Sequence, residues 1–130
     1  MPLENLDRAG MVERLSLSKL YVDLGDHPGR DRIPREAASQ GCVVIVGRHG
    51  AARNPVDIPL AARYKLSFYL SCKPAATNRY LSDILADIDT HRTNQWSYRE
   101  TIRRQAQIFA TEVRHLIWFL SRRYGRLEET

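Results

Sequence analysis

Lysine is scarce in this chain, and most of its positive charge comes from arginine. Of the 20 basic residues, only Lys19, Lys65 and Lys73 are lysines, and the other 17 are arginines. Arginine is favoured over lysine where a planar guanidinium must bind phosphate through two hydrogen bonds or stack on an aromatic ring. An anionic polymer is therefore the first partner to consider, although GC-rich coding or an overprinted reading frame also raises the arginine content.

Cysteine and histidine are few, and their spacing argues against several kinds of site. The four histidines, at positions 27, 49, 91 and 115, lack the spacing of metal ligands. The two cysteines, Cys42 and Cys72, are expected to form a small cross-strand pair in the core. The chain has no nucleophile elbow, phosphate-binding glycine loop or dinucleotide fingerprint. We expect no catalytic set, no cofactor and no metal.

Long apolar runs are also missing. The longest, such as Cys42–Val46, are far shorter than the ~20 residues that a membrane span needs. The segment Met1–Arg8 lacks the basic start and apolar core of a secretory signal. We therefore expect a protein of the cytosol or nucleus, its own or a host's, that is neither secreted nor in a membrane. The net charge of +5 and the pI of about 9.6 favour nucleic acid or an anionic surface, and 15 acidic residues moderate this.

The strand pattern predicts a small sheet in a single domain over residues 1–130. Alternating side chains predict strands at Ser16–Leu24 and Tyr64–Cys72, and a continuous β-branched run predicts a buried strand at Cys42–Val46. The segments 25–41 and 47–60 contain several Gly and Pro residues and are predicted to be long loops.

Helices are predicted mainly in the C-terminal half. The pattern indicates a short helix at about Leu3–Arg14, a second at about Thr77–Thr90, and a polar connector over residues 90–95. Ser97 and Glu100 have the spacing of a capping box, which would open a long last helix that Gly125 ends. The expected fold is α+β, with an antiparallel three-stranded sheet covered by the two C-terminal helices.

The last helix has two contrasting faces at 100° per residue. Its apolar stripe is expected to pack on the sheet or on the preceding helix, and consists of Tyr98, Ile102, Phe109, Val113, Leu116, Leu120 and Tyr124. Trp118 lies opposite this stripe. The Trp118 face also includes Arg104, Gln107, Thr111, Arg114 and Arg122, with His115 at its margin. Ile108 and Phe119 lie on a flank.

The Trp118 face supports more than one interpretation. It predicts a non-enzymatic protein that binds nucleic acid, RNA rather than DNA, through phosphate contacts and stacking of the indole on a base, as a viral or phage accessory protein would. The residues assigned to this interface are Arg104, Arg114, Trp118 and Arg122, with Arg103 and Arg123 as auxiliary charge. Alternatively, the same helix docks a partner or a second copy as a homodimer. A third possibility is packing within the chain, with the arginines as a solvated rim.

One stretch resembles an enzyme signature. The strand Cys42–Val46 leads into Gly47, Arg48, His49 and Gly50, which resembles the Arg-His-Gly signature of the histidine phosphatase (phosphoglycerate mutase-like) family. The resemblance covers residues 43–60, where Asp57, Pro59 and Leu60 match a downstream motif of some members. It implies that His49 is the nucleophile that becomes phosphorylated and that Arg48 holds the phosphate.

The other groups that this chemistry needs are hard to place in the sequence. A histidine phosphatase requires a second histidine beside a late strand, a further arginine and an acid for the leaving group. His91 and His115 follow the last predicted strand, in a connector and a helix. A phosphohydrolase is therefore a more distant alternative than a binding protein.

Overall fold

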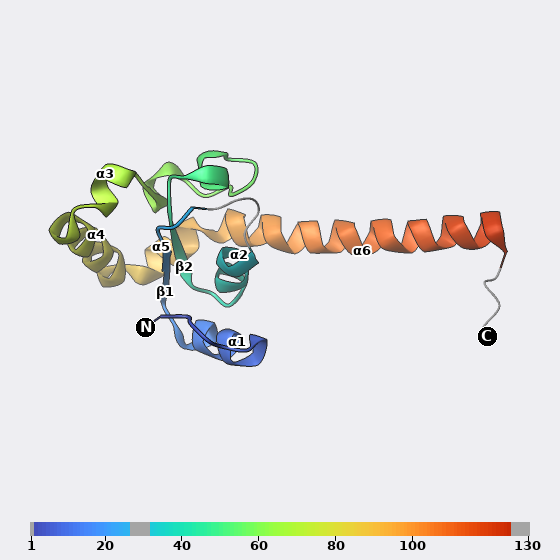
Figure 1. Ribbon diagram of the computed structural model, residues 1–130, viewed down its shortest axis with the longest axis horizontal. Coiled ribbons are helices and arrows are strands. Elements are labelled where there is room, and N and C mark those ends of the chain that lie inside the picture. The colour runs from blue at the N-terminus through green and yellow to red at the C-terminus, as the bar shows by residue number, and fades with distance from the viewer. Residues whose placement is uncertain (1, 27–31, 126–130) are drawn as a thin grey trace. The chain divides into compact units, whose positions relative to one another are not determined.

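The computed structural model describes residues 2–26 and 32–125 (Figure 1). The chain divides into two compact units, Met1–Arg99 and Glu100–Thr130. The first unit contains a three-stranded sheet and most of the helices. The second consists of the greater part of one long helix. The fold is α+β: a three-stranded parallel sheet with helices, an N-terminal helix and a long C-terminal helix.

The sheet is parallel, so the predicted antiparallel arrangement is wrong. Its strands, in the order β1-β2-β3, are Leu20–Asp23, Val43–Gly47 and Lys65–Leu66. β1 pairs with β2 from Leu20↔Val43 to Asp23↔Val46, and Figure 1 shows these two strands side by side. Parallel neighbours need a crossover connection, usually a helix. Helix α2 lies in this connection.

α2 spans Arg32–Ser39, in a region predicted to be a loop. Pro34, Ala37 and Ala38 are buried on one face of it, with the spacing of an amphipathic helix. Pro34 is tolerated because it lies in the first turn, and Gly41 follows the helix with a positive φ of 88°. The remaining part of the predicted loop, residues 27–31, lies outside the described residues.

The predicted strand Tyr64–Cys72 is mostly not a strand. β3 has only two residues, Tyr64 ends a short 3-10 helix (Ala62–Tyr64), and Phe68–Ser71 forms helix α3. The Ser67 hydroxyl accepts a hydrogen bond from the Leu70 N–H and caps α3. The strand therefore ends before Ser67, because the serine side chain competes with a neighbouring strand for hydrogen bonds to nearby backbone groups.

The two cysteines do not form the predicted core pair. Cys42 is buried just before β2, and its thiol donates to the carbonyl oxygens of Leu15 and Ser18 at 3.2 and 3.4 Å. Burial raises the pKa of this thiol. Cys72 is exposed at the C-terminal end of α3. The pairing expectation depended on antiparallel strands and fails with them.

β2 is the centre of the core, and every one of its residues is buried, as the β-branched run predicts. β3 pairs only with Val46 and Gly47. The buried side chain of Gln95 takes the place of a longer β3: its Oε1 accepts from the Val44 N–H and its Nε2 donates to the Val44 carbonyl, both at 2.8 Å. A glutamine predicted to lie in a polar connector therefore completes the hydrogen bonding of the central strand.

The helices differ in their bounds from the prediction. The N-terminal helix α1 spans Arg8–Leu17, and Asp7 caps it by accepting from the Gly10 N–H. The predicted second helix is α4 (Pro74–Ala86), and α5 (Ile88–Asn94) occupies most of the predicted connector. α2 and α5 contact β2, in place of the two C-terminal helices expected to cover the sheet.

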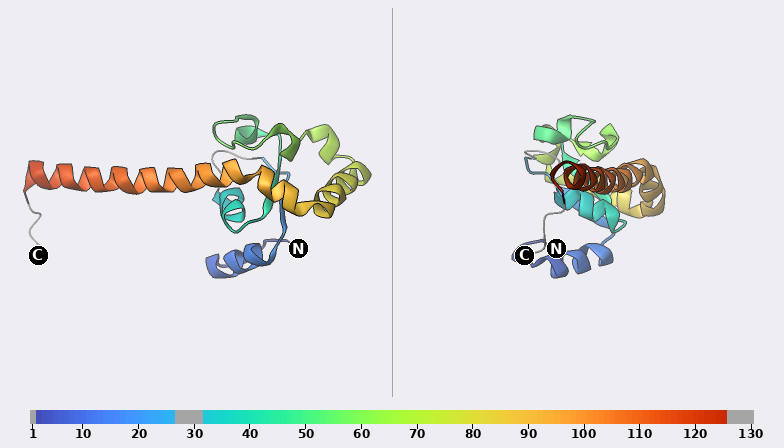
Figure 2. Two further views of the ribbon diagram at one scale, coloured as in Figure 1. Left: turned by 180° about the vertical axis from the view of Figure 1, so that it is seen from behind. Right: turned by 90° about the vertical axis from the view of Figure 1, so that its right-hand side faces the viewer.

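The last helix, α6, runs without a break from Trp96 to Tyr124 (Figure 2). Gly125 follows it with a positive φ of 73°, as predicted for its end. Ser97 lies inside the helix and not at its cap, so the predicted capping box does not open α6. None of the described helices combines the length and the apolar character that a membrane-spanning helix needs.

Candidate functional site

The predicted apolar stripe of α6 is exposed, so the expectation that it forms core is wrong for most of its length. Tyr98 is buried within the first unit, but Phe109 is 68% exposed. The further exposed members of the stripe are Val113, Leu116, Leu120 and Tyr124. Among the described residues nothing buries this part of the stripe, and exposed apolar stripes of this kind are commonly found at interaction surfaces.

The spacing within the stripe is that of a helix–helix seam. From Ile102, apolar residues recur at alternating intervals of four and three residues, at Ala106, Phe109, Val113, Leu116 and Leu120. Two helices with this repeat pack side chains of one into gaps of the other. We refer to these six residues, Ile102 included, as the apolar seam.

Trp118 lies on the opposite side of α6 from the apolar seam and is 59% exposed. The Arg122 guanidinium lies 5.0 Å from the centroid of the indole ring, one helical turn further on. Arg114 lies one turn before Trp118 and donates a hydrogen bond to the Thr111 hydroxyl. Three of the four principal residues predicted for the interface, Arg114, Trp118 and Arg122, thus form one exposed row, which we call the Trp118 row.

The fourth principal residue, Arg104, and the auxiliary Arg103 lie apart from this row and are already paired. Both bind the Glu100 carboxylate, with N–O distances of 3.0 Å for Arg104 and 2.6 Å for Arg103. Hydrogen bonds from these two guanidinium groups lower the pKa of Glu100 to about 2. Arg103 and Arg104 are therefore weaker candidates for phosphate contact than the other interface arginines. Those arginines, Arg114, Arg122 and Arg123, have no carboxylate partner among the described residues.

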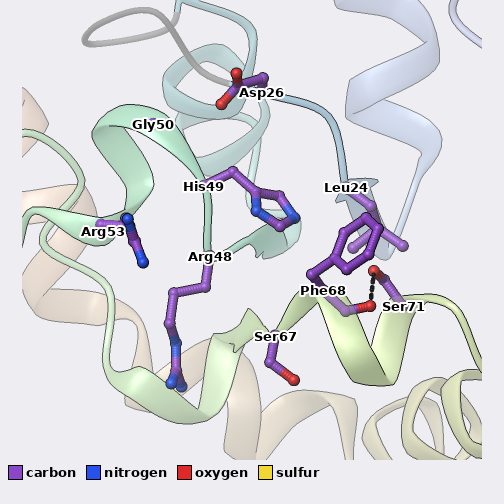
Figure 3. A pocket seen from close by; sticks show the side chains of 9 residues that line it. All are labelled: Leu24, Asp26, Arg48, His49, Gly50, Arg53, Ser67, Phe68 and Ser71. Atoms are coloured by element: carbon purple, nitrogen blue, oxygen red, sulfur yellow. Dashed lines mark hydrogen bonds between the residues drawn. The ribbon is translucent and has the colours of Figure 1, made fainter.

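A second candidate site lies in the first unit, in a pocket of about 650 Å³ (Figure 3). Its walls are the segments that follow the carboxyl ends of all three strands. The lining residues are Leu24 and Asp26 after β1, Arg48, His49, Gly50 and Arg53 after β2, and Ser67, Phe68 and Ser71 after β3. Parallel sheets characteristically bind ligands at this edge.

His49 is held at the centre of this pocket by close packing. The His49 and Phe68 rings form a T-shaped pair with centroids 5.8 Å apart, and Figure 3 shows the two side chains next to each other. Gly47 makes this position possible: a Cβ there would lie 2.8 Å from the His49 ring and 2.8 Å from the Leu24 carbonyl oxygen. The Arg48 N–H donates to the Leu66 carbonyl at 2.7 Å, which ties the segment to β3.

The structure brings together only part of what the phosphatase resemblance implies. Arg48 and His49 line the pocket together with Arg53 and Asp26, so a further arginine and an acid are present. His91 does not line it and instead hydrogen-bonds to the Tyr64 hydroxyl at 2.9 Å. Asp57 does not line it either, and His115 belongs to the second unit.

Sequence reasoning did not predict that Arg53, Asp26, Ser67 and Ser71 line this pocket. A glycine directly after a buried β-branched run, at Gly47, is a usable signal for a close approach at the end of a strand. The remaining residues converge only because the strands are parallel. Among the described residues there is no cluster of three or more His, Cys, Asp or Glu side chains suited to a metal ion.

The chain matches no protein family model, no curated protein and no solved structure at a level that indicates relationship.

Proposed function

We propose that α6 binds nucleic acid, RNA rather than DNA, through the Trp118 row and without catalysis. The observation that supports this most directly is the large exposed fraction of Trp118, whose ring lies beneath the Arg122 guanidinium. An indole that the fold leaves in solvent is available to stack on an unpaired base. Such stacking is worth ~1–3 kcal/mol per base.

The charges beside Trp118 suit a phosphate backbone. Arg114 and Arg122 lie one turn on either side of Trp118, and the auxiliary Arg123 lies against Phe119 and Tyr124. No described carboxylate binds any of these three guanidinium groups, so each is available to phosphate. Guanidinium groups bind phosphate through two hydrogen bonds and release counterions as they do so. With one aromatic platform and a few arginines, the interface would depend little on base sequence, and single-stranded RNA offers the unstacked bases that it needs.

A salt series with a single-stranded RNA oligomer tests this proposal. Three phosphate contacts predict that affinity falls roughly 20-fold between 50 and 200 mM salt. Trp118→Ala should raise Kd by ~5-fold to 160-fold, the range expected for one stacked base. Trp96→Ala is the matched control, because Trp96 is equally exposed but lies in the first unit. Binding that is flat with salt, or equally weakened by both substitutions, would rule out the Trp118 row.

Self-association through the apolar seam is a second candidate, and the exposure of Phe109, Val113, Leu116 and Leu120 at seam spacing specifically favours it. The seam and the Trp118 row lie on opposite sides of α6, so a dimer would leave two such rows free for RNA. Leu116→Glu should convert a dimer to a monomer in sedimentation velocity, while Trp118→Ala should leave the dimer intact. A wild-type chain that sediments as a monomer at high concentration would exclude this role.

A further inference from the structure

We propose that the pocket at the carboxyl ends of the three strands binds a small phosphorylated ligand that carries a planar ring. Arg48 and Arg53 would bind the phosphate, and Phe68 would stack on the ring. The proposal concerns the first unit alone, so it stands or falls independently of RNA binding by α6.

The described lining of the pocket carries more positive than negative charge. Neither the Arg48 nor the Arg53 guanidinium has a hydrogen bond or ion pair among the described residues, and both line the cavity. Lys65 is almost fully buried in β3 nearby, and burial followed by repulsion from Arg48 lowers its pKa. Asp26 is the single acidic side chain among the described lining residues. A dianion bound here would relieve the repulsion between the cations.

The two serines of the pocket differ in what they can offer. The Ser67 oxygen accepts from the Leu70 N–H, so its own hydroxyl proton is available to donate to phosphate. The Ser71 hydroxyl donates to the Phe68 carbonyl at 2.8 Å, as the dashed line in Figure 3 marks. Its oxygen is therefore an acceptor, which suits a hydroxyl group of the ligand better than its phosphate.

Phe68 supplies the second half of the recognition. It lines the cavity and is nevertheless 69% exposed. Much of the phenyl surface is thus open to a stacked ring. In the view of Figure 3, Arg48 and Arg53 lie on one side of His49 and Phe68 on the other, which separates a phosphate-binding end from a ring-binding end.

The size of the pocket agrees with a ligand of this class. The cavity of about 650 Å³ lies in the range of ~300–1,000 Å³ that small-ligand sites occupy. The close approach at Gly47 positions the His49 ring between the two ends of the pocket. Arg48, Arg53 and Phe68 are exposed and would lose side-chain freedom when they bind the ligand.

Calorimetric titration with AMP, adenosine and inorganic phosphate tests the proposal. AMP should bind saturably, and at least tenfold more tightly than adenosine, because the phosphate makes charged hydrogen bonds. Arg48→Gln and Arg53→Gln should each raise the Kd of AMP tenfold or more. Arg79→Gln, at an exposed arginine of α4 outside the pocket, is the matched control and should leave it unchanged.

Two further variants make the result decisive. Phe68→Ala should weaken AMP by ~5-fold or more and leave the affinity for inorganic phosphate unchanged. Trp118→Ala should not alter AMP binding, which separates this site from the RNA interface. Because Arg48, Arg53 and Phe68 are exposed, circular dichroism should show all variants folded. Absence of AMP binding, equal affinity for AMP and adenosine, or insensitivity to both arginine substitutions would overturn the proposal.

Discussion

The strand β2 and the helix α6 are both rich in large apolar side chains, yet the fold uses them in opposite ways. Every residue of β2 is buried, whereas the apolar seam of α6 is exposed beyond Ile102 at Phe109, Val113, Leu116 and Leu120. An apolar pattern identifies which side chains avoid water, but it does not identify what covers them. The contrast therefore predicts that the same substitution lowers the free energy of unfolding much more in β2 than in α6.

The largest difference in stability is expected between two isoleucine-to-alanine substitutions, one in each region. Ile45→Ala in β2 should lower the free energy of unfolding by ~2–5 kcal/mol, because it leaves a cavity in close-packed surroundings. Ile117→Ala in α6, where the side chain is exposed and lies outside the apolar seam, should change it by no more than ~0.5 kcal/mol. Urea denaturation of both variants measures the difference. Equal losses would show that the exposed face of α6 is covered in solution.

The same comparison can be made with glutamine. Gln95→Ala should cost ~2–4 kcal/mol, since the buried N–H and carbonyl of Val44 both lose their partner. Gln107→Ala, on the exposed part of α6, should be close to neutral in the same denaturation experiment. A small effect at Gln95 would mean that water replaces its amide.

A smaller effect is expected from charge on α6. Glu100→Gln removes the carboxylate that Arg103 and Arg104 share, which frees both guanidinium groups for phosphate. RNA affinity at 50 mM salt should rise several-fold, and the logarithmic salt slope should steepen by up to about 1.4. Glu112→Gln is the control, since no ion pair of Glu112 to a described residue is present. An unchanged slope would mean that RNA does not reach this turn of the helix.

The smallest effect concerns pH. The folded state lowers the pKa of Glu100 from 4.5 to about 2, so the stabilisation from its ion pairs is complete above pH 4.5. It is lost progressively as the pH falls from there towards 2. Titration of the Glu100 carboxyl by NMR should give a midpoint near the lower value. A midpoint near 4.5 would show that the two arginines do not hold this carboxylate in solution.

Local signals predicted several elements of this fold from sequence. Gly125 ends α6, and the β-branched run forms the buried central strand. The direction of the strands was not predictable in the same way, because it depends on whether the 25–41 segment contains a helix. Pro34 and the surrounding glycines concealed α2, although Pro34, Ala37 and Ala38 have helical spacing.

The candidate sites show the same limit. The periodicity of α6 identified the face that carries Trp118, but it could not show that Arg103 and Arg104 share one carboxylate or that the opposite stripe is exposed. The pocket was even harder to predict from the sequence. Arg48 and His49 stood out through a motif, whereas Asp26, Arg53 and Ser67 join them only through the parallel pairing of strands that are distant in sequence.

The short length of β3 has a consequence for solubility. At Val44, the edge of β2 that faces away from β1 is hydrogen-bonded to the side-chain amide of Gln95 and not to a neighbouring strand. Open strand edges invite pairing with other chains. A substitution at Gln95 would leave the N–H and carbonyl of Val44 without this partner. Strands of other molecules could then hydrogen-bond to this edge of β2, and aggregation of partly unfolded chains should begin there.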